Sequence, residues 1–216
     1  MMYRKIKSLA LQAYIRITKS IAYRKIRDFN DQQFFRLQLD RYFEHLGLNN
    51  SLTHTKYLIP LISNLNGICN QSKILIIGPC NKLELNAFES YGYKNIEAID
   101  LVSFDSRIKV MDMHDLKYEN NYFDLVYSTN TIHCTKTPNT VGSEIYRVTK
   151  NNGYIVLGVT VNLPLNDAVY ATDYKTSEGI KSILPNTVTL LYEKIVPPGY
   201  EENPHGTDFI KIIVQK

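Results

Sequence analysis

Lys73-Ile-Leu-Ile-Ile77 is the stretch of this chain that determines its architecture, because four consecutive apolar residues follow Lys73. Such an uninterrupted run, rich in β-branched residues, is typical of a central parallel strand covered on both faces. Similar runs follow at Asn95–Ile99, Ile108–Met111, Phe123–Tyr127 and Tyr154–Val159. The sequence therefore predicts at least five neighbouring strands.

Helical patterns separate these strands. The apolar faces, with the turn residues expected to close them, are Leu85, Phe88 and Tyr91 before Gly92, and Val141, Ile145 and Val148 before Asn151-Asn-Gly153. Strands that alternate with helices at this spacing form right-handed βαβ units. We therefore expect an α/β fold with a Rossmann-like, mostly parallel sheet.

The last segment of the chain departs from this alternation. Thr187–Val196 and Phe209–Val214 both have strand-like composition, and Pro197–Gly206 between them is too rich in Pro, Gly and Asn for a long helix. Strands joined without a helix usually pair in opposite directions. We predict an antiparallel hairpin at the edge of the sheet.

Residues 1–54 form a predicted basic, amphipathic helical extension ahead of a domain at residues 55–216. Eight Lys and Arg side chains lie in residues 1–27, before the first acidic residue, Asp28. Such an arm suits anionic lipid, nucleic acid or an acidic protein, and a solvated helix face or a transit peptide would look similar. We expect an anionic membrane surface or a protein partner, and no specific nucleic acid.

A further apolar segment, Tyr57–Leu65, opens the predicted domain. It contains Pro60, which should start or kink a helix rather than sit inside an unbroken one.

The length and composition of the chain limit the classes of protein to which it can belong. A chain of 216 residues with 44% hydrophobic and 21% charged residues is typical of one globular domain with an appendage. No stretch approaches the roughly 18 apolar residues of a membrane-spanning helix. The three cysteines and five histidines lack ligand spacing, so we expect no metal site and a reducing, cytoplasmic location, peripheral at a membrane if the arm docks there.

Polar residues follow the predicted strands, at the edge where open α/β sheets bind ligands. Gly78 follows the first strand and permits a sharp turn close to a ligand. Asp100 ends the second strand, 22 residues later, where a carboxylate accepts hydrogen bonds from ribose hydroxyls. A surface aspartate in a turn would occupy the same position.

The third and fourth strands are followed by two further polar segments. Asp112 could accept a hydrogen bond from an adenine amino group, or belong to an ordinary polar loop. Ser128–His133 follows the fourth strand, and His133 is the histidine that we expect to transfer protons there. The alternative is that His133 only orients its loop.

Together these segments resemble the class I S-adenosylmethionine (SAM)-dependent methyltransferases. Asp112-Met-His-Asp-Leu116, Tyr118 and Asn121-Tyr-Phe-Asp-Leu-Val126 match the family pattern D-x-x-x-L-x-F/Y-x-x-x-x-F-D-x-V. Glu144-Ile-Tyr-Arg-Val-Thr-Lys-Asn-Asn-Gly153 matches the family helix and turn Glu-x-x-Arg-Val-x-Lys-x-Gly-Gly. The resemblance covers residues 55–216 and implies SAM as the cofactor and a seven-stranded sheet whose last strand is reversed.

The resemblance also implies the site residues. Gly78, Pro79, Cys80 and Asn81 would border the methionine part of SAM, and Asp100 would hold its ribose, with Leu101 also in the cofactor site. Asp112 and the backbone of Met113 and His114 would contact its adenine, and Thr129 and Asn130 would line the methyl-donor side. In place of the family's acid and G-x-G-x-G loop, this chain has Ile76-Ile-Gly-Pro-Cys-Asn-Lys82, which keeps only the first glycine.

These features predict a SAM-dependent methyltransferase that acts on an oxygen or carbon of a small-molecule, sugar or lipid-linked acceptor. The Asn-Pro-Pro-Tyr-type loop associated with methylation of nucleobase amino groups is absent after the fourth strand. The altered glycine loop leaves open a catalytically inactive protein of this fold, serving as a scaffold or partner activator. A nucleotide-binding enzyme is disfavoured, because Pro79 has no N–H group for a phosphate.

Overall fold

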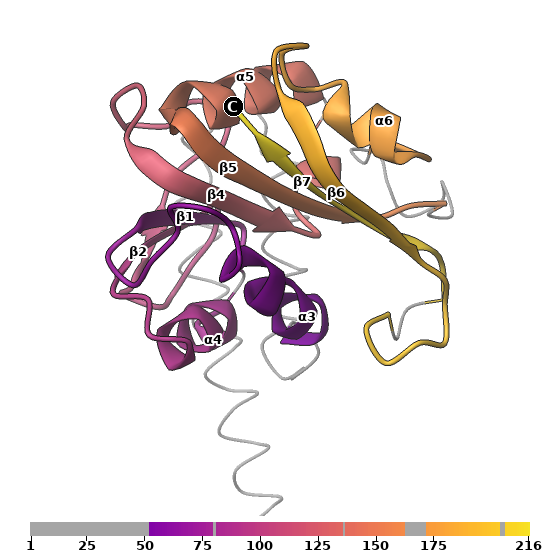
Figure 1. Cartoon of the computed structure of the whole chain (residues 1–216), viewed down its shortest axis with the longest axis horizontal. Helices are drawn as coiled ribbons and strands as arrows, with labels where there is room; N and C mark the ends of the chain where they lie inside the picture. The colour runs from indigo at the N-terminus through magenta and orange to yellow at the C-terminus, as the bar shows by residue number, and fades with distance from the viewer. Residues whose placement is uncertain (1–51, 80, 136, 163–171, 204–205) are drawn as a thin grey trace, which may run out of the picture. The chain divides into compact units, whose positions relative to one another are not determined.

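A single mixed sheet organises the part of the chain that the computed structural model describes, namely residues 52–79, 81–135, 137–162, 172–203 and 206–216. Its strands are β1 (Lys73–Ile77), β2 (Asn95–Asp100), β3 (Ile108–Val110), β4 (Phe123–Thr129), β5 (Thr149–Thr160), β6 (Thr189–Val196) and β7 (Phe209–Gln215). Their order across the sheet is β3-β2-β1-β4-β5-β7-β6. Figure 1 shows this arrangement.

Strands β1 to β5 pair in parallel, and β7 runs antiparallel to both β5 and β6. This confirms the predicted Rossmann-like, mostly parallel, seven-stranded sheet with its antiparallel C-terminal hairpin. The hairpin enters the sheet in one orientation: β7 lies inside, next to β5, and β6 forms the edge.

Helices cover both faces of the sheet, which explains the continuous apolar sequence of β1. Leu75 and Ile77 pack on the side of α5 (Pro138–Val148) and α6 (Ser177–Lys181). Ile74 and Ile76 pack on the opposite side, with α3 (Leu52–Ile62) and α4 (Leu83–Ser90) (Figure 1). Because successive side chains alternate across a strand, both faces of β1 must be apolar.

The expectation for Pro60 is wrong, because this residue lies inside helix α3. A proline removes one helical hydrogen bond and crowds the carbonyl four residues earlier. Here the cost falls in the last turn, since the helix ends at Ile62. Leu58, Ile59 and Ile62 are fully buried against the sheet, and this packing outweighs the local preference.

The expected closure of the second helix by Asn151-Asn-Gly153 is also wrong. Helix α5 ends at Val148 and β5 begins at the next residue, Thr149. The three residues lie within β5, at an irregularity where the register with β4 shifts, and Asn152 has a positive φ of 63°. These turn-forming residues therefore accommodate an irregularity within the strand and do not end the helix.

The predicted basic extension lies almost wholly outside the described residues. Its docking on an anionic surface or a protein partner therefore stays a prediction, as does the boundary at residues 54 and 55, which falls within α3. No helix among the described residues is long and apolar enough to cross a membrane.

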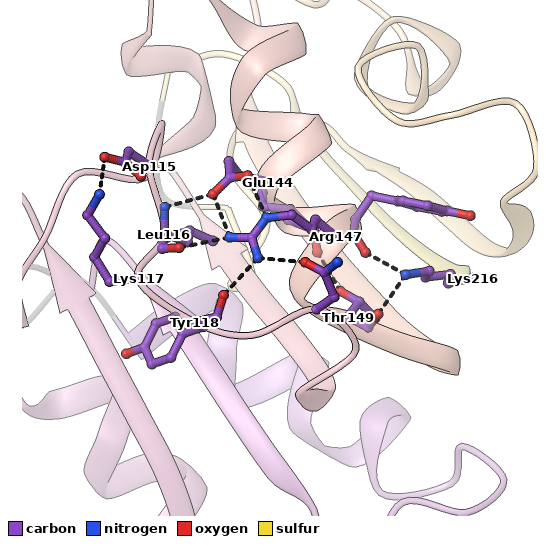
Figure 2. Close-up of polar contacts among 11 residues, drawn as sticks. Asp115, Leu116, Lys117, Tyr118, Glu144, Arg147, Thr149 and Lys216 are labelled. Atoms are coloured by element: carbon purple, nitrogen blue, oxygen red, sulfur yellow. Dashed lines mark hydrogen bonds and ion pairs between the residues drawn. The ribbon is translucent and has the colours of Figure 1, made fainter.

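One guanidinium holds the loop that follows β3 against α5 (Figure 2). Arg147 donates hydrogen bonds to the backbone carbonyls of Leu116 (2.8 Å) and Tyr118 (2.7 Å) and pairs with Glu144 (Nε–Oε1 2.7 Å). Glu144 Oε2 in turn accepts from the backbone N–H of Leu116 at 2.8 Å. Glu144 and Arg147, which belong to the most specific part of the family resemblance, thus hold this loop against helix α5.

Removing this guanidinium should destabilise the fold. Arg147→Met removes the donor of two loop carbonyls and the cationic partner of Glu144, so we expect the free energy of unfolding to fall by about 2–4 kcal/mol in urea denaturation. Arg107→Met is the matched control, because Arg107 makes exposed ion pairs with Glu89 and Asp105. Its loss should cost about 0.5 kcal/mol or less, and equal losses for the two variants would contradict the assignment.

Candidate functional site

Backbone hydrogen bonds bring the carboxyl ends of the parallel strands together at one edge. The N–H of Gly78 donates to Ile99 O (2.8 Å), and that of Met111 donates to Asp100 O (3.0 Å). On the other side of β1, the N–H of Asn130 donates to Gly158 O at 2.8 Å. The predicted site positions after β1, β2, β3 and β4 therefore share one edge of the sheet.

Gly78 is required by the contact between two loops. Its φ is +73°, and a Cβ added there would lie 2.1 Å from Thr131 Oγ1. The Thr131 hydroxyl donates to Gly78 O at 3.1 Å, which joins the loop after β1 to the loop after β4. Thr131 was not among the predicted site residues, and it fills the space beside the glycine.

The rest of the first loop leads into helix α4. Pro79 is buried, and Asn81 Oδ1 accepts from the N–H of Leu83 at 2.9 Å, so Asn81 satisfies one of the free donors at the start of the helix. Lys82 is exposed, and Cys80 lies outside the described residues. Asn81 therefore has a structural role in addition to its predicted place beside the cofactor.

Asp100, the predicted ribose-binding residue, ends strand β2, and Leu101 follows it. Asp100 and Leu101 are both half-buried, and Asp100 Oδ1 accepts from the N–H of Val102 at 3.2 Å. This hydrogen bond fixes the carboxylate at the edge of the sheet, next to Gly78. The geometry agrees with the position expected from the spacing, and the ribose contact itself stays a prediction.

The loop after β3 contains a three-residue relay. His114 Nδ1 and the His114 N–H both bond to Asp112 Oδ1, at 2.5 and 2.9 Å, and His114 Nε2 lies 2.5 Å from Thr135 Oγ1. The hydrogen bond from His114 is the main reason that the pKa of Asp112 is lowered. An ionised carboxylate needs a donor, so Nδ1 carries a hydrogen and Nε2 faces the hydroxyl.

The relay also orders the loop after β4. Thr135 Oγ1 accepts from the N–H of Thr137 at 3.0 Å, so its own hydrogen is available to His114 Nε2. Sequence reasoning assigned only an adenine contact to His114. The side-chain contact with Thr135 was missed because the two residues are 21 positions apart. Met113 packs against the core on the α5 side of the sheet.

The residues predicted after β4 have different environments. Thr129 is buried, and its hydroxyl donates to Glu84 Oε1 at 3.0 Å. Asn130 adopts a positive φ of 53°, and its Oδ1 accepts from the Thr160 hydroxyl at 2.9 Å. His133 lies in a short 3-10 turn, 8% exposed, and its carbonyl accepts from the N–H of Thr172 at 2.7 Å. Its catalytic role stays a prediction.

Glu84 is the buried acid that sequence reasoning missed. It lies in the first turn of α4, and Oε1 accepts hydrogen bonds from the hydroxyls of Thr55 and Thr129, both at 3.0 Å. Burial, the largest cause, and the nearby charge of Asp100 together raise the pKa of Glu84 to about 7. No group of three or more metal-ligating side chains occurs in the described ranges.

Substituting Gly78 tests the contact between the loops. Gly78→Ala should lower the free energy of unfolding by about 2–4 kcal/mol, because the new Cβ meets Thr131 in a left-handed backbone conformation. Gly199→Ala is the matched control, since Gly199 also has a positive φ, of 86°, but a Cβ added there would have no neighbouring atom within 4 Å. We expect about 1 kcal/mol there. A Gly78 variant no less stable than the Gly199 variant would refute the contact.

Comparison with known proteins agrees with this geometry. Residues 75–157, from β1 to β5, match a family model described as a methyltransferase domain. No curated protein matched the chain.

Solved structures share the fold at low sequence identity. A SAM-dependent methyltransferase from Mesorhizobium loti is 12% identical, with a TM-score of 0.54 over 73% of this chain and 96% of that one. A putative methyltransferase in complex with the Trm112 activator of Haloferax volcanii is 12% identical, with a TM-score of 0.60 over 88% and 96% of the two chains. The cyclase SpnF is 13% identical, with a TM-score of 0.59 over 74% and 80%. Residues 75–157 therefore match a methyltransferase domain, and the described sheet shares the fold of SAM-dependent methyltransferases.

Proposed function

We propose that this protein transfers the methyl group of SAM to an oxygen or carbon atom of a small-molecule, sugar or lipid-linked acceptor. The observation that carries the proposal is the convergence of Asp100, Asp112 and Gly78 at one edge of the sheet. The polar groups after β4, including Asn130, belong to the same edge.

The residues at this edge fit the cofactor that a methyltransferase domain implies. Asp100 offers a half-buried carboxylate for the ribose hydroxyls, and Asp112 offers an exposed one for the adenine amino group. The sulfonium of SAM is a cation, and two acids belong to this edge: Asp100 ends β2, and Glu84 is hydrogen-bonded to Thr129 at the end of β4. When bound, SAM would supply an electrophilic methyl group on a good leaving group.

The protein's own contribution would be alignment and proton removal. Holding the acceptor in line with the methyl group can supply several kcal/mol, on the order of 7–11 in well-oriented systems. An oxygen acceptor must also lose a proton. Two histidines at this edge are candidates, His133 and His114, and the hydrogen-bonded Asp112 and Thr135 orient the ring of His114. Both ring nitrogens of His114 are thus occupied, and its segment is the one expected at the adenine, so we propose His133 as the base.

A second candidate function is a catalytically inactive protein of this fold that acts as a scaffold or partner activator. Thr131 favours it, because this side chain fills the space beside the only glycine of the first loop. The methyltransferase of the archaeal complex, whose partner is described as an activator, shows only the same fold. Cofactor binding separates the two functions.

Calorimetry with SAM and with its demethylated product, S-adenosylhomocysteine, tests the proposed function. We expect both to bind, and Asp100→Asn to weaken binding about 10- to 100-fold, because a hydrogen bond to a charged group is worth about 1.5–3 kcal/mol. Asp115→Asn is the matched control, since Asp115 is an exposed loop acid that pairs with Lys117. Absence of binding at millimolar SAM would contradict the enzyme and favour the scaffold.

Methyl transfer to catechol, glucose and glycerol, followed with radiolabelled SAM, tests the base. His133→Gln should lower kcat about 10²- to 10⁴-fold on a methylated hydroxyl acceptor, while SAM affinity changes little. His114→Gln is the comparison variant. If only the His114 variant loses kcat, His114 is the base and our assignment to His133 is wrong.

A further inference from the structure

Glu84 has an environment that its position in a helix does not explain. The side chain is only 3% exposed, and the two hydroxyls that donate to Oε1 come from different elements, Thr55 from α3 and Thr129 from the end of β4. The hydroxyls of Thr55 and Tyr127 are hydrogen-bonded to each other at 2.8 Å. A buried carboxyl group is thus held in one orientation by neutral groups.

A carboxylate in such a place is costly unless a cation is near it. The groups that affect its ionisation within the described residues are the neutral hydroxyls of Thr55 and Thr129 and the negatively charged Asp100, and Tyr127 lies beside them on β4. No lysine or arginine is among them. Desolvation and the Asp100 charge raise the pKa of Glu84 to about 7.

The topology places this acid beside the cofactor edge. Strand β1 lies between β2 and β4 in the sheet. Asp100 ends β2, and Glu84 is hydrogen-bonded to Thr129, which ends β4, so each acid belongs to the carboxyl end of a strand next to β1. The position that the family resemblance reserves for an acid, before the glycine, is occupied here by Ile76. The acidic group therefore reaches this edge from the following helix.

SAM and its product differ at one charge. The sulfur of SAM is a sulfonium cation, and after loss of the methyl group the same sulfur is a neutral thioether. A cation that arrives near a buried carboxyl group favours its ionised form, and a neutral group does not. A group that responds to this difference would distinguish substrate from product.

We propose that Glu84 is the counter-charge for the cofactor's sulfonium, so that SAM binding drives Glu84 to ionise and release its proton to solvent, whereas the demethylated product leaves Glu84 protonated. The inference rests on the proposed function. Its step is balanced, since the carboxylic acid becomes a carboxylate and one proton leaves the protein. Glu84 is then a residue that selects the charged form of the cofactor.

The expected pH dependence follows from the direction of the shift. Below about pH 7, Glu84 is mostly protonated in the free protein, so SAM must displace a proton and its affinity should fall up to tenfold per pH unit. Above that pH the carboxylate is already formed and the affinity should level off. Affinity for S-adenosylhomocysteine should lack this dependence.

Calorimetry in two buffers of different ionisation enthalpy counts the released protons. At pH 6.5 we expect more than half a proton to leave the wild-type protein with SAM and about none with S-adenosylhomocysteine, given a pKa of about 7. Glu84→Gln should release none with either ligand and lose most of its preference for SAM. Glu89→Gln, an exposed acid on the same helix, should behave as the wild type.

The wild-type comparison can overturn the inference even if the Glu84 variant does not fold. Equal proton release with the two ligands overturns the role of Glu84 and leaves the proposed function intact. Absence of SAM binding overturns both. Unequal release that persists in Glu84→Gln assigns the proton to another group and also refutes the inference.

Discussion

The bidentate contact between Arg147 and Glu144 is the interaction on which the candidate site depends most. The loop between β3 and β4 has little regular structure, so its carbonyl groups need donors from elsewhere. A planar guanidinium can serve Leu116 O, Tyr118 O and the Glu144 carboxylate at once, which a lysine could not do with the same geometry. Because β3 has only three residues, this contact also holds the Asp112 segment close to the sheet.

The fold could be predicted largely from local sequence. The strand β1 was predicted at its observed bounds, and the hairpin of β6 and β7 followed from the lack of a helix between them. The two errors share one cause. Pro60 and Asn151–Gly153 carry strong local preferences, but burial of α3 and pairing of β5 with its neighbours determine their structure. The conformational preference of a single residue does not determine the structure where long-range packing contributes more free energy.

The candidate site could be predicted only in part. Gly78, Asp100 and Asp112 were predicted because they follow strands, and the structure brings these positions to one edge of the sheet. Glu84 was not found, because an acid in the first turn of a helix is ordinary, and its importance arises from Thr55, 29 residues earlier, and Thr129, 45 residues later. The contact of His114 with Thr135 is equally non-local. Such pairs become visible only when the chain is folded.

The position of β7 has a consequence for the order in which the protein is made. In the described sheet, β6 pairs with β7 alone, and only β7 joins it to β5. A growing chain produces residues 189–196 before residues 209–215, so β6 must wait for its neighbour while Val196, which is buried in the folded protein, is in contact with water. This end of the sheet therefore cannot close before β7 has been synthesised, and until then β6 is an unpaired strand that can associate with other chains.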